Sequence, residues 1–255
     1  MKTISVLNMK GGVGKTTTSI NLAIGLGNLG NKVLVIDFDP QANSSDIFTT
    51  EGNEYKYIDE VLEDTLPVVY ESTHKNVSFI PSRLELALTE RKIMLEQNKA
   101  QHSRLFKAIK GIRKDFDYIV IDCPPILNLL TVNALNASNE IIIPIKIDKA
   151  AEKGFAITLS NITEIADSYD LELDYKVLFT MVNNTKIDKA RMDQIIGNCK
   201  DNTINTRIRY QSKPVTEAGY KKVPVVEGNS NVGQDYKELC DELIATWTSC
   251  PGKKE

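Results

Sequence analysis

The sequence contains little of what marks several large classes of protein. Its four cysteines, at positions 123, 199, 240 and 250, form no C-x-x-C pair and have no histidine close by in the sequence. This spacing disfavours a zinc site or a disulfide framework and suits reduced thiols. No apolar run approaches the roughly 20 residues of a membrane helix, and a strand-like segment begins near residue 3, which leaves no room for a signal peptide. We therefore expect a soluble, cytoplasmic protein.

Glycine, proline and net charge are also low. The 255 residues include 14 Gly and 9 Pro, 42% are hydrophobic, and the formal charge is −3. This composition excludes collagen-like repeats and a mostly disordered chain. A chain of this length can bury a sizeable core in one α/β domain or in two smaller ones. Because no repeat and no linker-like segment interrupts it, we expect a single domain over residues 1–255.

Short β-branched segments alternate with longer helical patterns. Several strand-like segments are apolar on nearly every residue, which indicates burial on both faces. The pattern predicts strands at residues 3–7, 32–36, 77–80, 118–121, 141–145, 176–181 and 223–226. It predicts helices at residues 15–29, 57–62, 83–110, 129–136, 156–169, 188–198 and 235–247. We therefore expect an α/β fold with a mostly parallel, twisted sheet and helices on both faces.

The segment that follows the first predicted strand has the character of a phosphate-binding loop. Residues 8–17 read N-M-K-G-G-V-G-K-T-T and open the first predicted helix. Glycines let successive N–H groups point at phosphate oxygens, and the helix N-terminus adds partial positive charge. Lys15 would reach the β- and γ-phosphates and the Thr16 hydroxyl would ligate Mg²⁺. The segment predicts a P-loop NTPase that binds ATP through Lys10, Gly11, Gly12, Val13, Gly14, Lys15, Thr16 and Thr17.

This loop departs from the common pattern G-x-x-x-x-G-K-[ST]. The first glycine of that pattern would fall on Met9, and a second lysine, Lys10, stands before the glycines. With the motif K-G-G-V-G-K-T the sequence resembles the deviant Walker A ATPases. In that family the first lysine of the motif reaches the ATP of a partner subunit. The resemblance therefore implies an ATP-dependent homodimer with catalytic roles for Lys10 and Lys15.

Two predicted strands end on acidic residues. Residues 33–44 read V-L-V-I-D-F-D-P-Q-A-N-S and residues 118–125 read Y-I-V-I-D-C-P-P. Ligands bind at the carboxyl ends of parallel strands, so all three aspartates are expected beside the phosphates. The resemblance implies that Asp39 orients the attacking water, a catalytic role. It also implies that Asp37 helps to place Mg²⁺ through solvent and that Asp122 holds the water shell of Mg²⁺.

Further segments are similar to one branch of this family, the ParA/Soj partition ATPases. The similarity runs through residues 37–44, 122–135, 141–146 and 216–218. It implies an ATPase that dimerises on ATP, binds DNA non-specifically and releases it on hydrolysis, distributing plasmid or chromosomal cargo with a ParB-type centromere-binding partner. It also suggests Asn183 as an adenine contact, although a simple turn residue is an equal alternative. Since a strand begins near residue 3, we expect no separate N-terminal helix-turn-helix domain.

The net charge conceals an uneven distribution. Residues 186–222 contain nine basic and four acidic side chains, a local charge of +5, so the other 218 residues carry −8. A local basic segment on an acidic body is compatible with sequence-independent contacts to DNA phosphates. A solvated surface of mixed charge remains the alternative. We expect DNA contacts from Lys186, Arg191, Arg209 and Lys213, and hence association with the nucleoid.

Other functions within the same superfamily are less compatible with the sequence. A MinD-like ATPase that acts at a membrane is the main alternative, and it needs a basic amphipathic helix at its end. The last predicted helix instead carries four acidic residues and only one lysine on its polar face, at positions 235, 238, 241, 242 and 237. An anionic bilayer would repel that face. A metal-cluster carrier would need a second cysteine near Cys123, and no motif indicates a small-molecule substrate.

Overall fold

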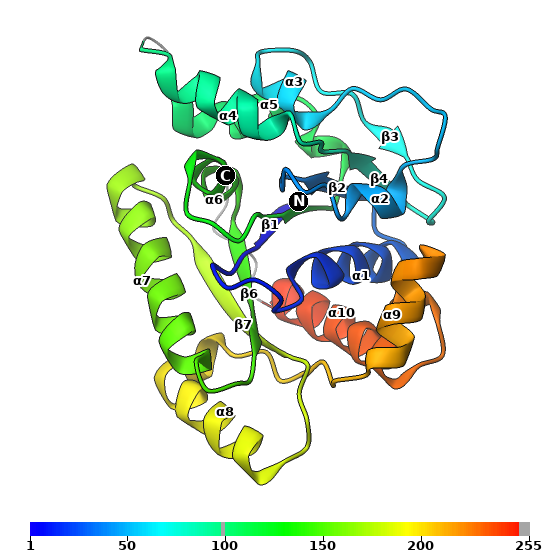
Figure 1. Ribbon diagram of the computed structural model, residues 1–255, viewed down its shortest axis with the longest axis vertical. Helices are drawn as coiled ribbons and strands as arrows, with labels where there is room; N and C mark the ends of the chain where they lie inside the picture. The colour runs from blue at the N-terminus through cyan, green and yellow to red at the C-terminus, as the bar shows by residue number, and fades with distance from the viewer. Residues whose placement is uncertain (98–99, 250–255) are drawn as a thin grey trace.

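One twisted sheet forms the centre of the protein (Figure 1). The structure, a computed structural model, describes residues 1–97 and 100–249. The strands are β1 (Lys2–Val6), β2 (Val33–Asp37), β3 (Tyr70–Glu71), β4 (Val77–Ile80), β5 (Tyr118–Asp122), β6 (Glu140–Lys146) and β7 (Asp174–Thr180). Their order across the sheet is β3-β4-β2-β5-β1-β6-β7. Every neighbouring pair is parallel except β3 and β4. The predicted mostly parallel sheet is confirmed.

Helices connect the strands and cover both faces of the sheet. They are α1 (Lys15–Asn28), α2 (Ser45–Phe48), α3 (Ile58–Leu62), α4 (Leu86–Leu95), α5 (Arg104–Ile109), α6 (Leu129–Ala137), α7 (Ala151–Tyr169), α8 (Lys186–Cys199), α9 (Ser212–Lys221) and α10 (Asn231–Ser249). Short 3₁₀ turns occupy Gln101–Ser103, Arg113–Asp115, Lys200–Asn202 and Val225–Glu227. Helices α1 and α10 pack together on one face (Figure 1), and α4 to α8 contribute to the other.

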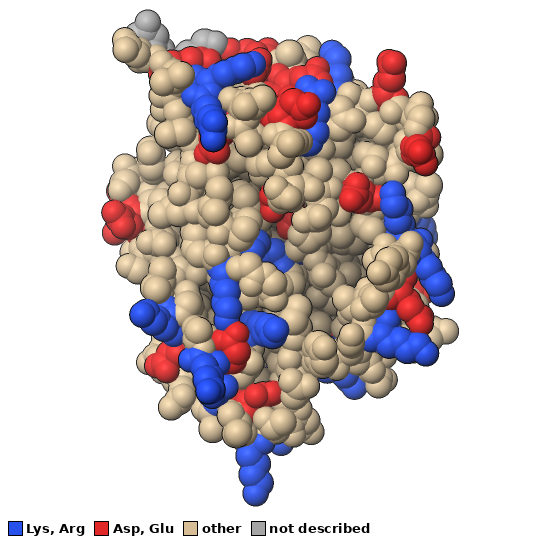
Figure 2. All heavy atoms as spheres, in the orientation of Figure 1, with Lys and Arg blue, Asp and Glu red and all other residues tan. Residues whose placement is uncertain are grey.

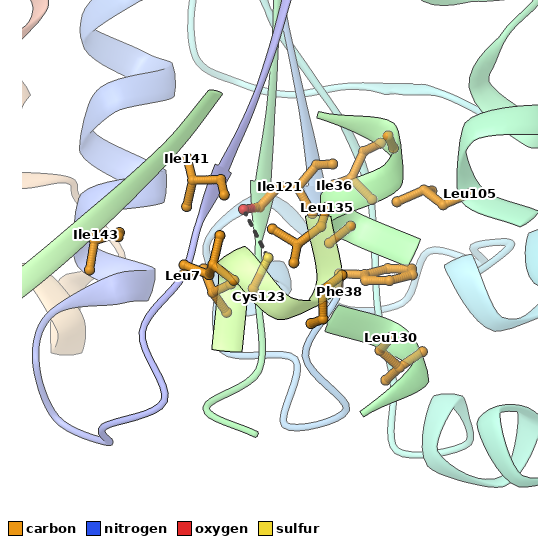
Figure 3. Packing of buried hydrophobic residues seen from close by; sticks show 14 of the residues in the cluster. Leu7, Ile36, Phe38, Leu105, Ile121, Cys123, Leu130, Leu135, Ile141 and Ile143 are labelled. Atoms are coloured by element: carbon orange, nitrogen blue, oxygen red, sulfur yellow. Dashed lines mark hydrogen bonds between the residues drawn. The ribbon is translucent and has the colours of Figure 1, made fainter. Parts of the chain in front are cut away.

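The sheet separates two hydrophobic cores. Successive residues of a strand point to opposite faces, so Leu34 and Ile36 of β2 enter one core while Val33 and Val35 enter the other. Figure 3 shows part of the first core, in which the Cys123 thiol lies among aliphatic side chains. Burial on both faces explains why the strands lack polar alternation in the sequence. The three cysteines that the structure describes are free and buried, while Cys250 lies outside the described residues.

Two predicted elements differ from the structure. The predicted strand at residues 223–226 is wrong, because Val225–Glu227 forms a 3₁₀ turn beside α1. Its valines are buried against that helix, and the Val226 N–H donates to Asn21 Oδ1 over 2.9 Å. The predicted helix over 83–110 is divided into α4, a 3₁₀ turn and α5, and its residues 98–99 lie outside the described part. In both segments an apolar pattern predicted a continuous strand or helix, but the backbone hydrogen bonds of that element do not run through the whole segment.

Close packing of α1 predicts a large cost for one small substitution. A Cβ atom on Gly27 would lie 2.5 Å from the Lys75 carbonyl oxygen and 2.8 Å from Val77 Cγ2. We expect Gly27→Ala to lower the free energy of unfolding by about 1–3 kcal/mol, because backbone has to move. Gly197 in α8 is the matched control, since its added Cβ meets nothing within 4 Å. Gly197→Ala should raise stability by about 0.5–1 kcal/mol. Urea unfolding of both variants tests this; equal effects would contradict it.

Candidate nucleotide-binding site

The loop between β1 and α1 forms a concave backbone turn. Gly12 and Gly14 have φ angles of +69° and +88°, in the left-handed region that glycine adopts without strain. A Cβ atom on Gly11 or Gly12 would meet no atom within 4 Å, so open space lies in front of the loop. The end of β7 supports the loop from behind, where Thr180 Oγ1 donates to the Val13 carbonyl over 2.8 Å. The turn and its open face fit a phosphate chain at the start of α1.

Lys15 lies in the first turn of α1, where it is largely buried. Its Nζ donates to the Lys10 carbonyl over 3.3 Å. Burial lowers the pKa of Lys15, and the nearby charges of Asp122 and Asp39 oppose that effect. A buried ammonium group that faces carboxylates and an open glycine turn is suited to bind the terminal phosphates of a nucleotide.

Asp122 ends β5 and is paired in register with Val6 of β1 and Asp37 of β2. Its Oδ1 accepts a hydrogen bond from Ser19 Oγ over 3.0 Å. Its Oδ2 is buried and has no hydrogen-bond partner among the described residues. Burial, followed by the charge of Asp37, raises the pKa of Asp122 to about 7. A buried carboxylate oxygen without a partner is costly, and the cation of a metal-nucleotide complex would satisfy it.

Asp37 lies beside Asp122, but its two carboxylate oxygens already have partners. Oδ1 accepts the Asp39 N–H over 3.1 Å, and Oδ2 accepts the Ser45 N–H and Oγ–H over 2.8 and 2.7 Å. Burial raises the pKa of Asp37 to about 6, while the bonds from Ser45 oppose the shift. The structure therefore shows that Asp37 holds the loop of residues 38–45. Its contact with Mg²⁺ through solvent stays a prediction.

Asp39 lies on that loop, two residues beyond the end of β2. It is largely buried, and its Oδ1 accepts the Gln41 N–H over 2.9 Å. Because Asp37 fixes the backbone N–H of Asp39, and Ser45 fixes the other end of the loop, the position of Asp39 is well defined. The charge of the Asp39 carboxylate acts on Lys15, where it opposes the lowering of the Lys15 pKa by burial. Such a group can orient a water molecule and accept its proton.

Three supporting residues were not predicted from the sequence. Ser45 and Ser19 hold the two buried carboxylates, and Asn8 joins the loop to the neighbouring strand β6 through a bond from Nδ2 to the Pro144 carbonyl over 2.7 Å. Ser19 comes four residues after Lys15, on the same face of α1, and this spacing could have identified it. Nothing in the local sequence marks Ser45 or Asn8, whose partners are eight and 136 residues away.

Two other predicted nucleotide contacts, Asn183 and Lys10, have partners within the chain. Asn183 is exposed in the turn between β7 and α8. Its N–H donates to Asp188 Oδ2 over 3.1 Å and its carbonyl accepts the Thr185 N–H, so its backbone has a turn role. A contact of its side chain with adenine stays a prediction. Lys10 forms an ion pair with Asp148 of its own chain.

The predicted DNA-contacting residues are spread over α8, α9 and the segment between them. Lys186 begins α8, Arg191 is half-buried on it, and Lys213 lies in the first turn of α9. On the face that Figure 2 shows, basic side chains outnumber acidic ones in the lower half, where Figure 1 places α8 and α9. Arg209 differs from the other three, because its Nε donates to the buried Asp235 of α10 over 2.8 Å. The structure thus gives Arg209 a partner within the chain.

The raised pKa of Asp122 predicts a pH-dependent effect of its replacement. The native pKa of Asp122, about 7, exceeds the ordinary value of 3.8, so the carboxyl group ionises at lower pH in the unfolded chain than in the folded protein. The free energy of unfolding of the protein therefore falls as pH rises from about 4 to about 7. Asparagine does not ionise. We therefore expect nucleotide-free Asp122→Asn to gain stability relative to the original protein between about pH 5 and about pH 8, by more than about 1 kcal/mol. Urea unfolding at both pH values measures it; a difference that is independent of pH would contradict it.

Comparisons with known proteins agree with this geometry. A family model described as an AAA domain (AAA_31) matches residues 1–175. The chain is 31% identical over 252 residues to the sporulation initiation inhibitor protein Soj of Bacillus subtilis, covering 96% of this chain and 98% of that protein. It is also 31% identical over 256 residues to the chromosome-partitioning ATPase Soj of Treponema pallidum, covering 96% and 97%.

A solved structure gives the same fold. Cobyrinic acid a,c-diamide synthase from Mycobacterium smegmatis, determined with an ATP analogue and magnesium, superposes with a TM-score of 0.82. The match covers 98% of this chain and 96% of that one, at 24% identity. The glycine turn, the aspartates at the ends of β2 and β5, and the full-length similarity to Soj lead to one assignment: the chain belongs to the ParA/Soj family of P-loop ATPases.

Proposed function

We propose that this protein is an ATP-dependent partition ATPase. It binds ATP with Mg²⁺, dimerises, binds DNA without sequence preference, and releases the DNA when ATP is hydrolysed. The observation that carries this proposal is a buried Lys15 that feels the charges of Asp122 and Asp39 at the start of an open glycine turn. The Oδ2 atom of Asp122 is also buried and has no hydrogen-bond partner among the described residues. The similarity to two Soj proteins over nearly their full lengths supports the cellular role.

The cofactors follow from the chemistry of the site. The described residues contain no cluster of three acidic, histidine or cysteine side chains that would hold a metal ion without help. Mg²⁺ commonly binds through one or two protein oxygens together with phosphates and water. The Thr16 hydroxyl would supply a protein oxygen here, while Asp122 would hold the water shell of the ion and Asp37 would help to place it through solvent. The M. smegmatis relative by fold was determined with an ATP analogue and magnesium, which supports the same pair of cofactors.

Each residue of the site has a defined task in hydrolysis. Lys15 neutralises charge on the terminal phosphates, and the N–H groups of residues 11–16 bind their oxygens. Asp39 orients the attacking water and accepts its proton. Lys10 extends to the nucleotide of a second protomer, so that each site is complete only in the dimer. Bound Mg²⁺ supplies further neutralisation of phosphate charge.

DNA binding is proposed for the basic segment of residues 186–222. Dimerisation would bring two copies of this +5 segment onto one duplex, whereas a monomer offers one copy on an acidic body. Contacts to phosphates carry no sequence information. Binding would therefore require ATP, occur anywhere on the nucleoid, and end on hydrolysis. A ParB-type partner would determine where hydrolysis is stimulated and which plasmid or chromosomal cargo is moved.

The salt dependence of binding tests the phosphate contacts. For the ATP-bound protein on random-sequence duplex DNA, we expect log K to fall by about 0.9 per neutralised phosphate for each unit of log salt concentration. Lys186→Ala and Lys213→Ala should each reduce that slope by about 1 per contact removed. Lys114→Ala is the control, since Lys114 is exposed outside the basic segment. Fluorescence anisotropy over a salt series measures this, and salt-independent or sequence-selective binding would contradict it.

A MinD-like role at a membrane is less well supported. The apolar face of α10 is buried against α1 and the sheet through Val232, Tyr236, Leu239 and Leu243. That face is therefore not available to a bilayer. Within residues 1–97 and 100–249, no helix is both long enough and apolar enough to cross a membrane.

One experiment separates the two roles. The protein is sedimented with random-sequence DNA and, separately, with anionic liposomes, each with and without ATP. The partition proposal expects ATP-dependent recovery with DNA and none with liposomes. Recovery with liposomes alone would replace it with the membrane role.

A further inference from the structure

Lys10 is held by its own chain in the nucleotide-free structure. Its Nζ forms an ion pair with Asp148, which lies in the connection between β6 and α7. The side chains of Lys10 and Asp148 retain 32% and 37% of their exposure, so both remain within reach of solvent and of a second molecule. The aliphatic part of Lys10 lies along the first turn of α7, with Cδ 4.0 Å from the Cβ position of Gly154.

The surrounding hydrogen bonds fix both partners of this ion pair. The Lys10 N–H donates to Asn8 Oδ1 over 2.9 Å, and Thr158 Oγ1 of α7 donates to the same oxygen over 3.2 Å. On the other side, Asp148 Oδ1 accepts the Ala150 N–H over 2.9 Å, which orients the carboxylate. Because the two backbones are already in place, the pair costs less conformational entropy than two free surface side chains.

The ion pair opposes the proposed role of Lys10 in a dimer. The hydrogen bond from Lys10 is the main reason that the pKa of Asp148 lies below its ordinary value, so Asp148 is ionised at neutral pH. A carboxylate on the ammonium group cancels much of the charge that would attract a phosphate. A triphosphate that approaches Lys10 from a second protomer would also meet the negative charge of Asp148.

We propose that Asp148 is a positioning residue that keeps Lys10 on its own protomer until a second, ATP-bound protomer competes for it. This inference rests on the proposed ATP-dependent dimer. Dimerisation then includes the transfer of Lys10 from Asp148 to the phosphates of the partner. The ion pair raises the threshold for dimerisation, so that contact between protomers is weak unless a triphosphate is present to replace the carboxylate.

Asp148→Asn tests the proposal, because it removes the charge and keeps an oxygen for the Ala150 N–H. With a non-hydrolysable ATP analogue and Mg²⁺, we expect the dimer dissociation constant to fall by about two- to fivefold for each of the two Lys10 residues. Asp148→Glu should keep the original value. Asp167→Asn, on the exposed side of α7, is the matched control. Sedimentation velocity provides the constants, and an unchanged or higher constant for Asp148→Asn would overturn the proposal.

A second measurement does not depend on dimerisation. Reductive methylation of Lys10 in the nucleotide-free monomer, quantified by mass spectrometry, should be faster in Asp148→Asn and unchanged in Asp167→Asn. An unchanged rate would show that Asp148 does not hold Lys10 and would overturn the inference. Lys10→Ala should not dimerise on ATP, and adding Asp148→Asn to it should not restore a dimer; ATP-dependent dimerisation of this double variant would assign the effect of Asp148 to something other than Lys10. If the original protein does not dimerise with ATP at all, the partition proposal fails, while the methylation rates still decide the ion pair.

Discussion

Lys10→Ala is expected to abolish ATP-dependent dimerisation while the monomer still binds ATP. The Lys10 side chain forms an ion pair with Asp148, and the Lys15 ammonium group donates to the backbone carbonyl of residue 10 rather than to its side chain. That carbonyl and the glycine turn survive the substitution. We therefore expect nucleotide affinity within about a factor of ten of the original, and no dimer with ATP at concentrations where the original protein dimerises fully. Sedimentation velocity and binding of a fluorescent ATP analogue measure the two properties.

The control for this variant is Lys149→Ala. Lys149 is exposed, lies in the same connection between β6 and α7, and carries the same charge. Its removal should change dimerisation little, because loss of general positive charge is not the proposed cause. A Lys10→Ala protein that still dimerises on ATP would show that Lys10 does not reach the partner, and the proposed completion of each site across the dimer would be wrong.

Asp39→Ala is expected to reduce ATP hydrolysis by about 10²- to 10⁴-fold, the usual contribution of a general base. ATP binding and dimerisation should persist, because Lys15, Thr16 and Asp122 remain. Alanine keeps the backbone N–H that Asp37 accepts, so the loop retains that anchor. Since release of DNA depends on hydrolysis in the proposed cycle, the variant should stay on DNA after the original protein has dissociated. Phosphate release and DNA dissociation in the presence of excess ATP measure both effects.

Asp46→Ala is the matched control for Asp39→Ala. Asp46 is an exposed aspartate in α2, seven residues further along the same segment. Its replacement should leave hydrolysis unchanged. Hydrolysis at the original rate in Asp39→Ala would show that another group orients the water.

Asp37 and Asp39 show how the structure distinguishes residues that one motif presents together. Asp37 ends β2 and Asp39 lies two residues beyond it, and the sequence assigns both to the phosphate end of the sheet. Both carboxylate oxygens of Asp37 accept hydrogen bonds, from the Asp39 N–H and from Ser45, whereas among the described residues the Asp39 carboxylate accepts the Gln41 N–H at Oδ1 alone. The structure therefore shows Asp37 as an anchor of the loop, and we expect a variant at this position to displace Asp39.

The charge distribution is a second case in which position matters more than totals. A formal charge of −3 argues against DNA, but the sequence segment 186–222 carries +5. The structure shows which basic side chains of this segment already have acidic partners. Arg209 is bound to the buried Asp235, and Lys213 is near Glu217, with 4.0 Å between Nζ and Oε1. Lys186 is exposed at the start of α8 and forms no ion pair with any residue that the structure describes. Basic residues that count equally in the composition therefore differ in whether an acidic side chain of the same chain lies beside them.

The sequence by itself determined the sheet, the phosphate loop and the aspartates at the ends of β2 and β5. These features depend on local physics: β-branched runs favour strands, glycines allow left-handed turns, and parallel strands bring their carboxyl ends to one edge. Their information therefore lies within a few consecutive residues. The incorrect strand at residues 223–226 shows the limit of such patterns, since a buried apolar run can pack on a helix as well as join a sheet.

Only the tertiary structure decided which partners these residues have. Asp122 lies beside Asp37 because β2 and β5 are neighbours, Ser45 bonds to Asp37 across a folded loop, and Lys10 meets Asp148 from 138 residues away. The energies of hydrogen bonds, ion pairs and burial depend on distances in space, and a distance across the fold is not encoded in the spacing along the chain. The sequence thus identified the reactive groups, and the fold determined which of them are free and which are held.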